Sequence, residues 1–126
     1  MLKFKYYDES AKTEHLWCDS TSIYYSRMVE DANENKGNLF VTFKTGATYL
    51  YKDVKFEDYI LYAAGGTDFS QGKSLNKLIK PKYECEKIEN ALPIEEIDKL
   101  MLEFQKKLKE EAESAEELQP TETEEE

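Results

Sequence analysis

Alternation of apolar and polar positions fills the first half of the chain and predicts a series of short β-strands. The clearest strand is LFVTFK, in which Leu39, Val41 and Phe43 fall on one face. Thr45-Gly46 follows as a hairpin turn, because glycine tolerates a positive φ. The expected strands are residues 3–7, 14–18, 22–30, 39–44, 47–54 and 82–88.

The apolar spacing becomes helical after residue 54. A stripe at i, i+3, i+4 and i+7 predicts a core-facing helix, made by Phe56, Tyr59, Ile60 and Ala63. Gly65-Gly66 is expected to end this helix. A second helix is expected over residues 71–80, with Ser70 as its N-cap and Pro81 as its stop. Its predicted buried side consists of Leu75, Leu78 and Ile79.

A long C-terminal helix is expected over residues 92–112, because Pro93 suits a first helical turn. Its narrow apolar seam consists of Ile97, Met101, Phe104 and Leu108. Two interpretations of the seam stay open: docking on the domain, or pairing with a partner helix, including one from a second copy of the chain. Residues 113–126 are dominated by Glu, Thr, Gln and Pro and are expected to form a disordered acidic tail.

These elements predict an α+β fold in a chain of 126 residues. We expect a small antiparallel β-sheet packed by two short helices, followed by the long helix and the disordered acidic tail. Residues 1–21 are expected to extend the sheet of a central domain that covers residues 22–88.

Charge is distributed unevenly along the chain, although the net charge is −10. Residues 1–92 hold 13 Lys/Arg and 14 Asp/Glu, whereas residues 93–126 hold 4 and 13. The body is therefore almost neutral, and nucleic acid is not excluded as its partner. The run MLKFKYYDES lacks the apolar core of a signal peptide, and no stretch is long and apolar enough to span a membrane. With Cys18 and Cys85 far apart and expected to be reduced, these features predict a cytoplasmic protein without a membrane partner.

The most concentrated basic face belongs to the second expected helix. Lys73, Lys77 and Lys80 recur at i, i+4 and i+7, so they share one side of it. Such a face contacts phosphates in nucleic-acid binders, but a solvated helix surface is the more common meaning of a lysine run.

Tyr49 and Tyr51 share a face of their strand, but the hairpin register decides which face. A two-residue turn places them opposite Thr42 and Phe40, away from the main core face. A three-residue turn over Thr45–Ala47 pairs Phe43 with Tyr49 and Val41 with Tyr51, on the core face. We favour buried rings, because the alternative occupants, Thr48 and Lys52, are poor core residues. The other reading is a platform on which bases stack.

An ordered set of motifs across half the chain resembles the KTSC domain, a short module found at the C-terminus of some lysyl-tRNA synthetases and in small stand-alone bacterial and phage proteins. The matching residues are Ser22-Ile23, Leu39, Val41, Phe43, Gly46, Tyr49, Tyr51, Val54, Tyr59, Ala63, Ser70, Gly72, Asn76, Ile79-Lys80 and Tyr83. Lys55 departs from the proline that is usual in the family. The resemblance implies the domain fold and a suggested role in RNA binding, without an established activity.

Signatures of catalysis are missing from the sequence. GGTDFSQGKS encloses five residues between Gly66 and Gly72 instead of the four of a phosphate-binding loop, and a helix is expected before it. His15 is the only histidine, and with two distant cysteines it makes no zinc site. We therefore expect no enzyme, no cofactor and no metal.

The best functional hypothesis is a non-enzymatic binding module for RNA or a nucleotide-like ligand. Lysines are expected to hold phosphates, and tyrosines and an amide to contact the base or sugar; the candidates are Tyr49, Tyr51, Lys73, Asn76, Lys77 and Lys80. The alternative is a small phage or bacterial regulator that inhibits a host protein through the C-terminal helix. A related possibility is a homo-oligomer that sequesters a nucleotide signal between its subunits.

Overall fold

The computed structural model describes residues 2–19, 22–31, 34–64 and 71–118. The chain divides into two compact units, Met1–Pro93 and Ile94–Glu126, and each is described by itself. The expected cap at Gly65-Gly66 and the expected N-cap Ser70 lie outside the described residues, as do residues 119–126 of the expected tail.

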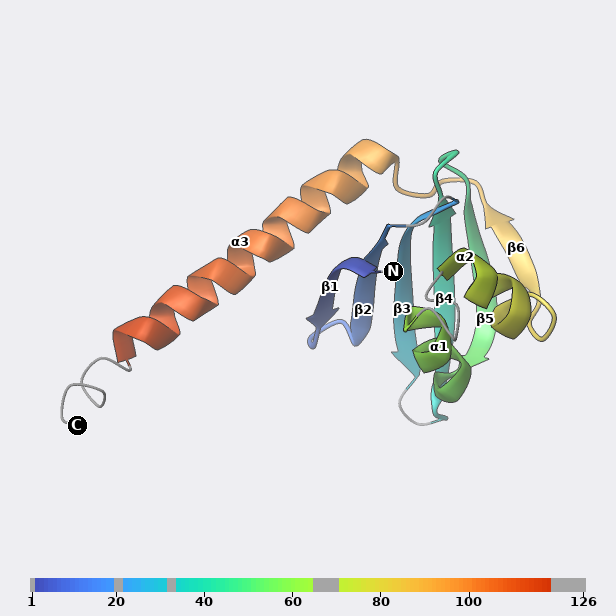
Figure 1. The fold of residues 1–126 in the computed structure, drawn as a ribbon, viewed down its shortest axis with the longest axis horizontal. Helices are drawn as coiled ribbons and strands as arrows, with labels where there is room; N and C mark the ends of the chain where they lie inside the picture. Colours follow the sequence, from blue (N-terminus) through green and yellow to red (C-terminus); the bar gives the residue numbers. More distant parts are fainter. Residues whose placement is uncertain (1, 20–21, 32–33, 65–70, 119–126) are drawn as a thin grey trace. The chain divides into compact units, whose positions relative to one another are not determined.

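A six-stranded antiparallel sheet forms the first unit, and its strands are neighbours in the order of the chain (Figure 1). The strands are β1 (Leu2–Asp8), β2 (Thr13–Cys18), β3 (Ile23–Asp31), β4 (Lys36–Phe43), β5 (Thr48–Lys55) and β6 (Cys85–Ile88). The α+β prediction is confirmed. β4 begins earlier than expected because Gly37 lets the backbones of β3 and β4 approach closely. A Cβ at this position would lie 2.4 Å from the Val29 carbonyl oxygen.

The register of β4 and β5 places both tyrosines on the core face. Leu39 pairs with Tyr51, and Val41 pairs with Tyr49. The face is the one expected for a three-residue turn, so the prediction of rings on the core side is confirmed. The pairings given for both turn lengths are wrong, because each tyrosine lies opposite a different residue.

The turn itself explains the displacement. It consists of Lys44, Thr45 and Gly46, one residue earlier than expected, and Gly46 adopts a φ of 97°. The Gly46 N–H donates to the Phe43 carbonyl at 2.8 Å, and the Phe43 N–H donates to the Ala47 carbonyl at 2.8 Å. A third turn residue in the left-handed region is the usual way to close such a hairpin, and only glycine enters it freely.

Three helical segments cover one face of the sheet: α1 (Phe56–Ala63), α2 (Gln71–Ser74) and the π-helical turn η1 (Leu75–Ile79) (Figure 1). The second expected helix is therefore interrupted by a wider turn, in which the Lys80 N–H donates to the Leu75 carbonyl at 2.9 Å. Leu75 and Ile79 are buried, as expected, and Leu78 packs partly buried against the same core.

The buried side of α1 differs from the expected stripe. Ile60 is 63% exposed, whereas Tyr62 is completely buried. The hydroxyls of Tyr62 and Ser26 lie 2.5 Å apart beneath the helix, and the buried Asp58 accepts a hydrogen bond from Tyr83. The helix turns toward these polar partners, which apolar periodicity does not reveal, and Ile60 faces solvent as a result.

The opposite face of the sheet carries an aromatic cluster. Trp17 packs against Phe4 and Tyr25, with ring centroids 5.6 and 4.8 Å away. His15 is buried, and its Nδ1 lies 2.6 Å from the Tyr25 hydroxyl. Burial, helped by the Arg27 charge, lowers the pKa of His15 to about 4, so the ring is neutral near pH 7. The only histidine is thus a packed residue of a strand.

The second unit contains the helix α3 (Ile94–Leu118). Its bounds pass the expected helix end at residue 112, and the disorder expected for residues 113–126 stays a prediction. Glu residues propagate a helix well, which explains the extension. The seam residues Ile97, Met101, Phe104 and Leu108 all lie within α3.

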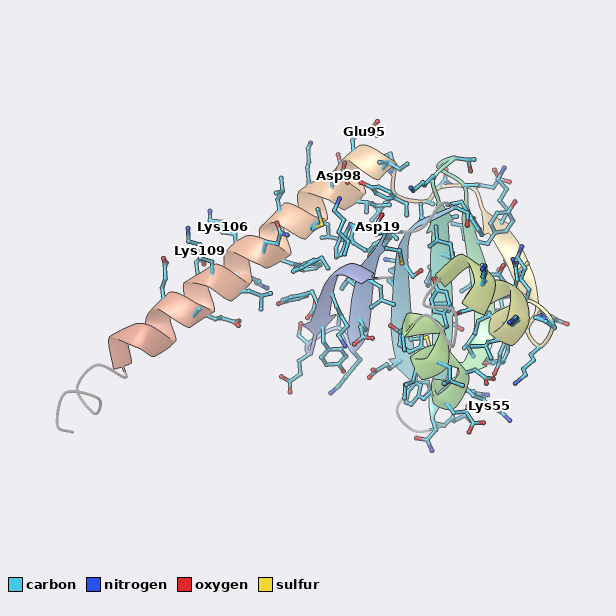
Figure 2. The ribbon with its side chains drawn as sticks, viewed as in Figure 1. Asp19, Lys55, Glu95, Asp98, Lys106 and Lys109 are labelled. Atoms are coloured by element: carbon cyan, nitrogen blue, oxygen red, sulfur yellow. The ribbon has the colours of Figure 1, made fainter. Side chains whose placement is uncertain are left out.

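Charged side chains project from α3 along its length, as Figure 2 shows for Glu95, Asp98, Lys106 and Lys109. Within the ranges that the structure describes, no helix has an apolar stretch long enough to cross a membrane.

Candidate functional site

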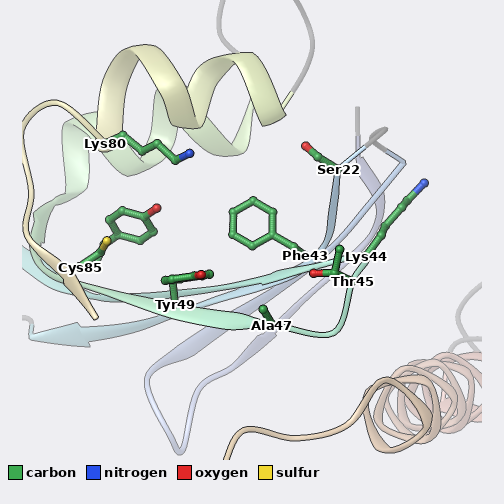
Figure 3. A pocket seen from close by; sticks show the side chains of 9 residues that line it. Ser22, Phe43, Lys44, Thr45, Ala47, Tyr49, Lys80 and Cys85 are labelled. Atoms are coloured by element: carbon green, nitrogen blue, oxygen red, sulfur yellow. The ribbon is translucent and has the colours of Figure 1, made fainter. Parts of the chain in front are cut away.

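A pocket of about 580 Å³ opens on the helix-covered side of the sheet, between the β4–β5 hairpin and the end of η1 (Figure 3). We call it the aromatic pocket. It is lined by Ser22, Phe43, Lys44, Thr45, Ala47, Tyr49, Tyr51, Lys80 and Cys85. Its volume falls within the range of roughly 300–1,000 Å³ that is usual for small-molecule sites.

The hairpin turn builds one end of the aromatic pocket. Its hydrogen bonds hold Phe43 opposite Ala47, and the Lys44 N–H donates to the Ser22 carbonyl at 2.8 Å. The last bond ties the turn to the start of β3. Gly46 supplies the positive φ that this turn requires, and the hydrogen bonds hold the backbone of this end.

Aromatic rings form the floor of the pocket. Phe43 and Tyr49 are half-buried and meet edge to face, with centroids 5.7 Å apart and planes at 80°. Such a pair leaves ring surface available to a further flat group. Tyr51 is 2% exposed and belongs mainly to the core. Burial, together with a hydrogen bond to the Cys85 thiol, raises the pKa of Tyr51 to about 12, so its phenol is neutral near pH 7.

Lys80 brings positive charge to the pocket. Its side chain extends from the end of η1 toward Phe43, whereas the side chain of the lining residue Lys44 points away from the rings (Figure 3). Among the residues that the structure describes, no acidic side chain lines this pocket. The combination of apolar rings and the Lys80 ammonium group suits a flat ligand that carries negative charge.

The segment between Lys80 and Cys85, which forms one wall of the pocket, is held by hydrogen bonds of Tyr83 and Lys82. Tyr83 donates a 2.5 Å hydrogen bond to the buried carboxylate of Asp58, and the Lys82 ammonium lies 3.3 Å from the same group. The Lys55 N–H donates to the Tyr83 hydroxyl at 3.1 Å. Burial alone would raise the pKa of Asp58, but the hydrogen bonds from Tyr83 and Lys82 outweigh it and lower the pKa. Asp58 is therefore a carboxylate near pH 7.

The structure brings together only part of the candidate binding set. Tyr49, Tyr51 and Lys80 line the aromatic pocket. The other candidates, Lys73, Asn76 and Lys77, are exposed on the helical segment and do not line it. The reason is the π-helical turn: an extra residue in that turn rotates Lys80 away from the stripe that a regular helix would form with Lys73 and Lys77.

Six lining residues were not identified as binding candidates from the sequence: Ser22, Phe43, Lys44, Thr45, Ala47 and Cys85. Phe43 had a usable signal, because it shares its face with Tyr49 in any register that buries the tyrosines. Cys85 had none, since its place depends on how β6 pairs with β5.

The histidine and the two cysteines do not come together at the pocket. His15 belongs to the aromatic cluster on the other face of the sheet. Both cysteines are free, Cys18 buried and Cys85 exposed. In the described part of the chain, no three His, Cys, Asp or Glu side chains gather in a way that could hold a metal ion.

Comparison with known proteins assigns no family: no protein-family model matches the chain, and no curated protein matches it. The resemblance to the KTSC domain therefore stays a prediction.

Proposed function

We propose that the first unit is a non-enzymatic binding module for RNA or a nucleotide-like ligand, and that the aromatic pocket is its site. One observation carries the proposal: Tyr49, Tyr51 and Lys80, selected from the sequence for this role, line the same pocket of about 580 Å³.

The chemistry of the lining supports this choice. A base stacked on an aromatic side chain contributes about 1–3 kcal/mol, and this gain does not depend on the identity of the base. The half-buried Phe43 and Tyr49 offer ring surface for it. Lys80 supplies a positive charge for a phosphate. The suggested RNA-binding role of KTSC domains points in the same direction.

Charge reversal tests the proposal. We expect Lys80→Glu to weaken binding of a single-stranded RNA oligonucleotide or a nucleotide by at least about ten-fold, because it places a negative charge beside the phosphate. Lys77→Glu makes the same change on the same helical segment outside the pocket, and it should have little effect. Lys5→Glu on β1, at the far edge of the sheet, is a second control.

Equal losses in Lys80→Glu and Lys77→Glu would instead favour the whole lysine face as the binding surface. Unchanged affinity and unchanged salt dependence in Lys80→Glu would contradict the proposal.

Regulation by protein–protein contact is the second candidate function. The observation that favours it is the exposure of Leu102 (62%) and Leu108 (41%) on α3. Native mass spectrometry of the protein purified from its own host would report a retained nucleotide, a bound protein or a homo-oligomer as distinct masses. A bound protein without any nucleotide would favour this candidate.

A further inference from the structure

We infer that the aromatic pocket takes one nucleotide unit, a single phosphorylated aromatic base, and does not bind along a nucleic-acid strand. This inference rests on the proposed function and specifies its ligand. The same chemistry occurs in a free nucleoside monophosphate and at the phosphorylated end of a single strand.

The rings limit the ligand to one base. A strand-binding surface offers successive exposed rings, each of which stacks a base. Here Tyr51 is 2% exposed, because it is held in the core opposite Leu39. Among the described lining residues, the half-buried rings are those of Phe43 and Tyr49, and they stand edge to face instead of in a row. The floor therefore has room to stack one flat group.

The charges limit the ligand to few phosphates. In the described part of the chain, the basic residues of the lining are Lys80 and Lys44. The body of the protein holds 13 Lys/Arg against 14 Asp/Glu, so it has no basic excess to follow a polyanion. The lysines that would continue a path, Lys73 and Lys77, do not line the pocket.

The geometry also suggests the orientation of the ligand. Lys80 reaches across the pocket from the helical side, while Phe43 and Tyr49 stand on the sheet (Figure 3). The base would lie on the rings, and the phosphate would face the Lys80 ammonium. Ser22, exposed at the hairpin end of the pocket, is placed to contact a polar edge of the ligand.

Calorimetric titration of the full chain tests the inference with the four nucleoside monophosphates, the four nucleosides and a single-stranded RNA of roughly ten nucleotides. We expect at least one monophosphate to bind, and its nucleoside to bind at least about ten-fold more weakly, since the phosphate contact is lost. The slope of log K against log salt should be about −1 or shallower, as one phosphate contact requires.

Variants locate the site. Lys80→Glu and Tyr49→Leu should each weaken the monophosphate at least about ten-fold, whereas Tyr49→Phe, which keeps the ring, and Lys77→Glu should change its affinity less than about two-fold. Thermal melts show whether each variant is folded. Lys80 is exposed, whereas Tyr49 packs partly buried against the core, so the melts matter most for Tyr49→Leu.

The two sources of the ligand are separated by linear RNA with a 5′-phosphate and by circular RNA of the same sequence. Binding of the linear form but not the circular form supports the inference and identifies a strand end; binding of the free monophosphate alone supports it and identifies a free nucleotide. Binding of circular RNA with a steep salt slope and no monophosphate binding overturns the inference but leaves the proposed function in place. Absence of binding by every probe overturns both.

Discussion

The Tyr83 phenol donates a 2.5 Å hydrogen bond to the buried carboxylate of Asp58, 25 positions earlier in the chain. This bond fixes the segment between Lys80 and Cys85, which carries one wall of the aromatic pocket. We expect Tyr83→Phe to lower the free energy of unfolding by about 1–3 kcal/mol, since a buried carboxylate loses a donor. Urea unfolding measures the change.

Tyr7→Phe is the matched control, because the Tyr7 hydroxyl donates at 3.0 Å to Glu30 on an exposed surface. Its effect should stay below about 0.5 kcal/mol. Equal effects of the two replacements would show that burial of Asp58 does not strengthen the Tyr83 bond.

Acid should destabilise the protein through His15. Its pKa is lowered to about 4 in the folded chain, against 6.5 in an unfolded chain. The unfolded state therefore binds the proton more readily, and the neutral ring contributes stability that is fully present above pH 6.5. This contribution, up to about 3 kcal/mol, is lost as the pH falls from 6.5 toward 4.

Chemical unfolding measured at intervals between pH 7.5 and pH 4 tests this expectation. His15→Phe removes the titrating group, so its stability should depend less on pH across this window whatever its absolute value. Parallel pH profiles for the two proteins would contradict the role given to His15.

Gly37 and Gly46 are both needed, but for different reasons. A Cβ at Gly37 would lie 2.4 Å from a backbone carbonyl, so Gly37→Ala should cost about 1–3 kcal/mol through overpacking. Gly46 has open space around it but a φ of 97°, so Gly46→Ala should cost about 1 kcal/mol through backbone strain. Thermal unfolding compares the two.

Asn is the informative second replacement, because it tolerates a positive φ better than Ala. Gly46→Asn should be milder than Gly46→Ala, whereas Gly37→Asn should be at least as harmful as Gly37→Ala. The reverse order would contradict this division.

Ser26 and Tyr62 form a buried pair with their hydroxyls 2.5 Å apart. Tyr62→Phe should cost about 1–2 kcal/mol, and the loss should shrink when Ser26 is already Ala, because the partner has been removed. A double-mutant cycle measures this coupling. Strictly additive losses would show that the bond makes no net contribution.

Most of the fold was predictable because period-two alternation reports which side of a strand is buried. It placed Leu39, Val41 and Phe43 on the core face and indicated each of the six strands. Apolar periodicity did not predict which side of α1 is buried. Asp58 and Tyr62 are buried and form hydrogen bonds with partners far away in sequence, and Ile60 faces solvent as a result.

The candidate site was predictable from its rings but not from its charges. Tyr49 and Tyr51 share a face in every register, and the pairing of β5 with β4 determines which face of the sheet it is. The position of Lys80 depends on a π-helical turn, for which the sequence carries no clear signal. A regular helix was assumed, and it grouped Lys80 with Lys73 and Lys77 instead of with the tyrosines.

The strand order of the sheet has a consequence for how the protein folds. Each strand pairs only with its neighbours in the chain, and the first four connections between strands are four residues long. Short loops cost little closure entropy, so we expect the sheet to assemble hairpin by hairpin and faster than sheets with crossover connections. The β5–β6 pairing encloses the three helical segments and should form last. On this basis the aromatic pocket is completed only at the end of folding, when β6 joins the sheet.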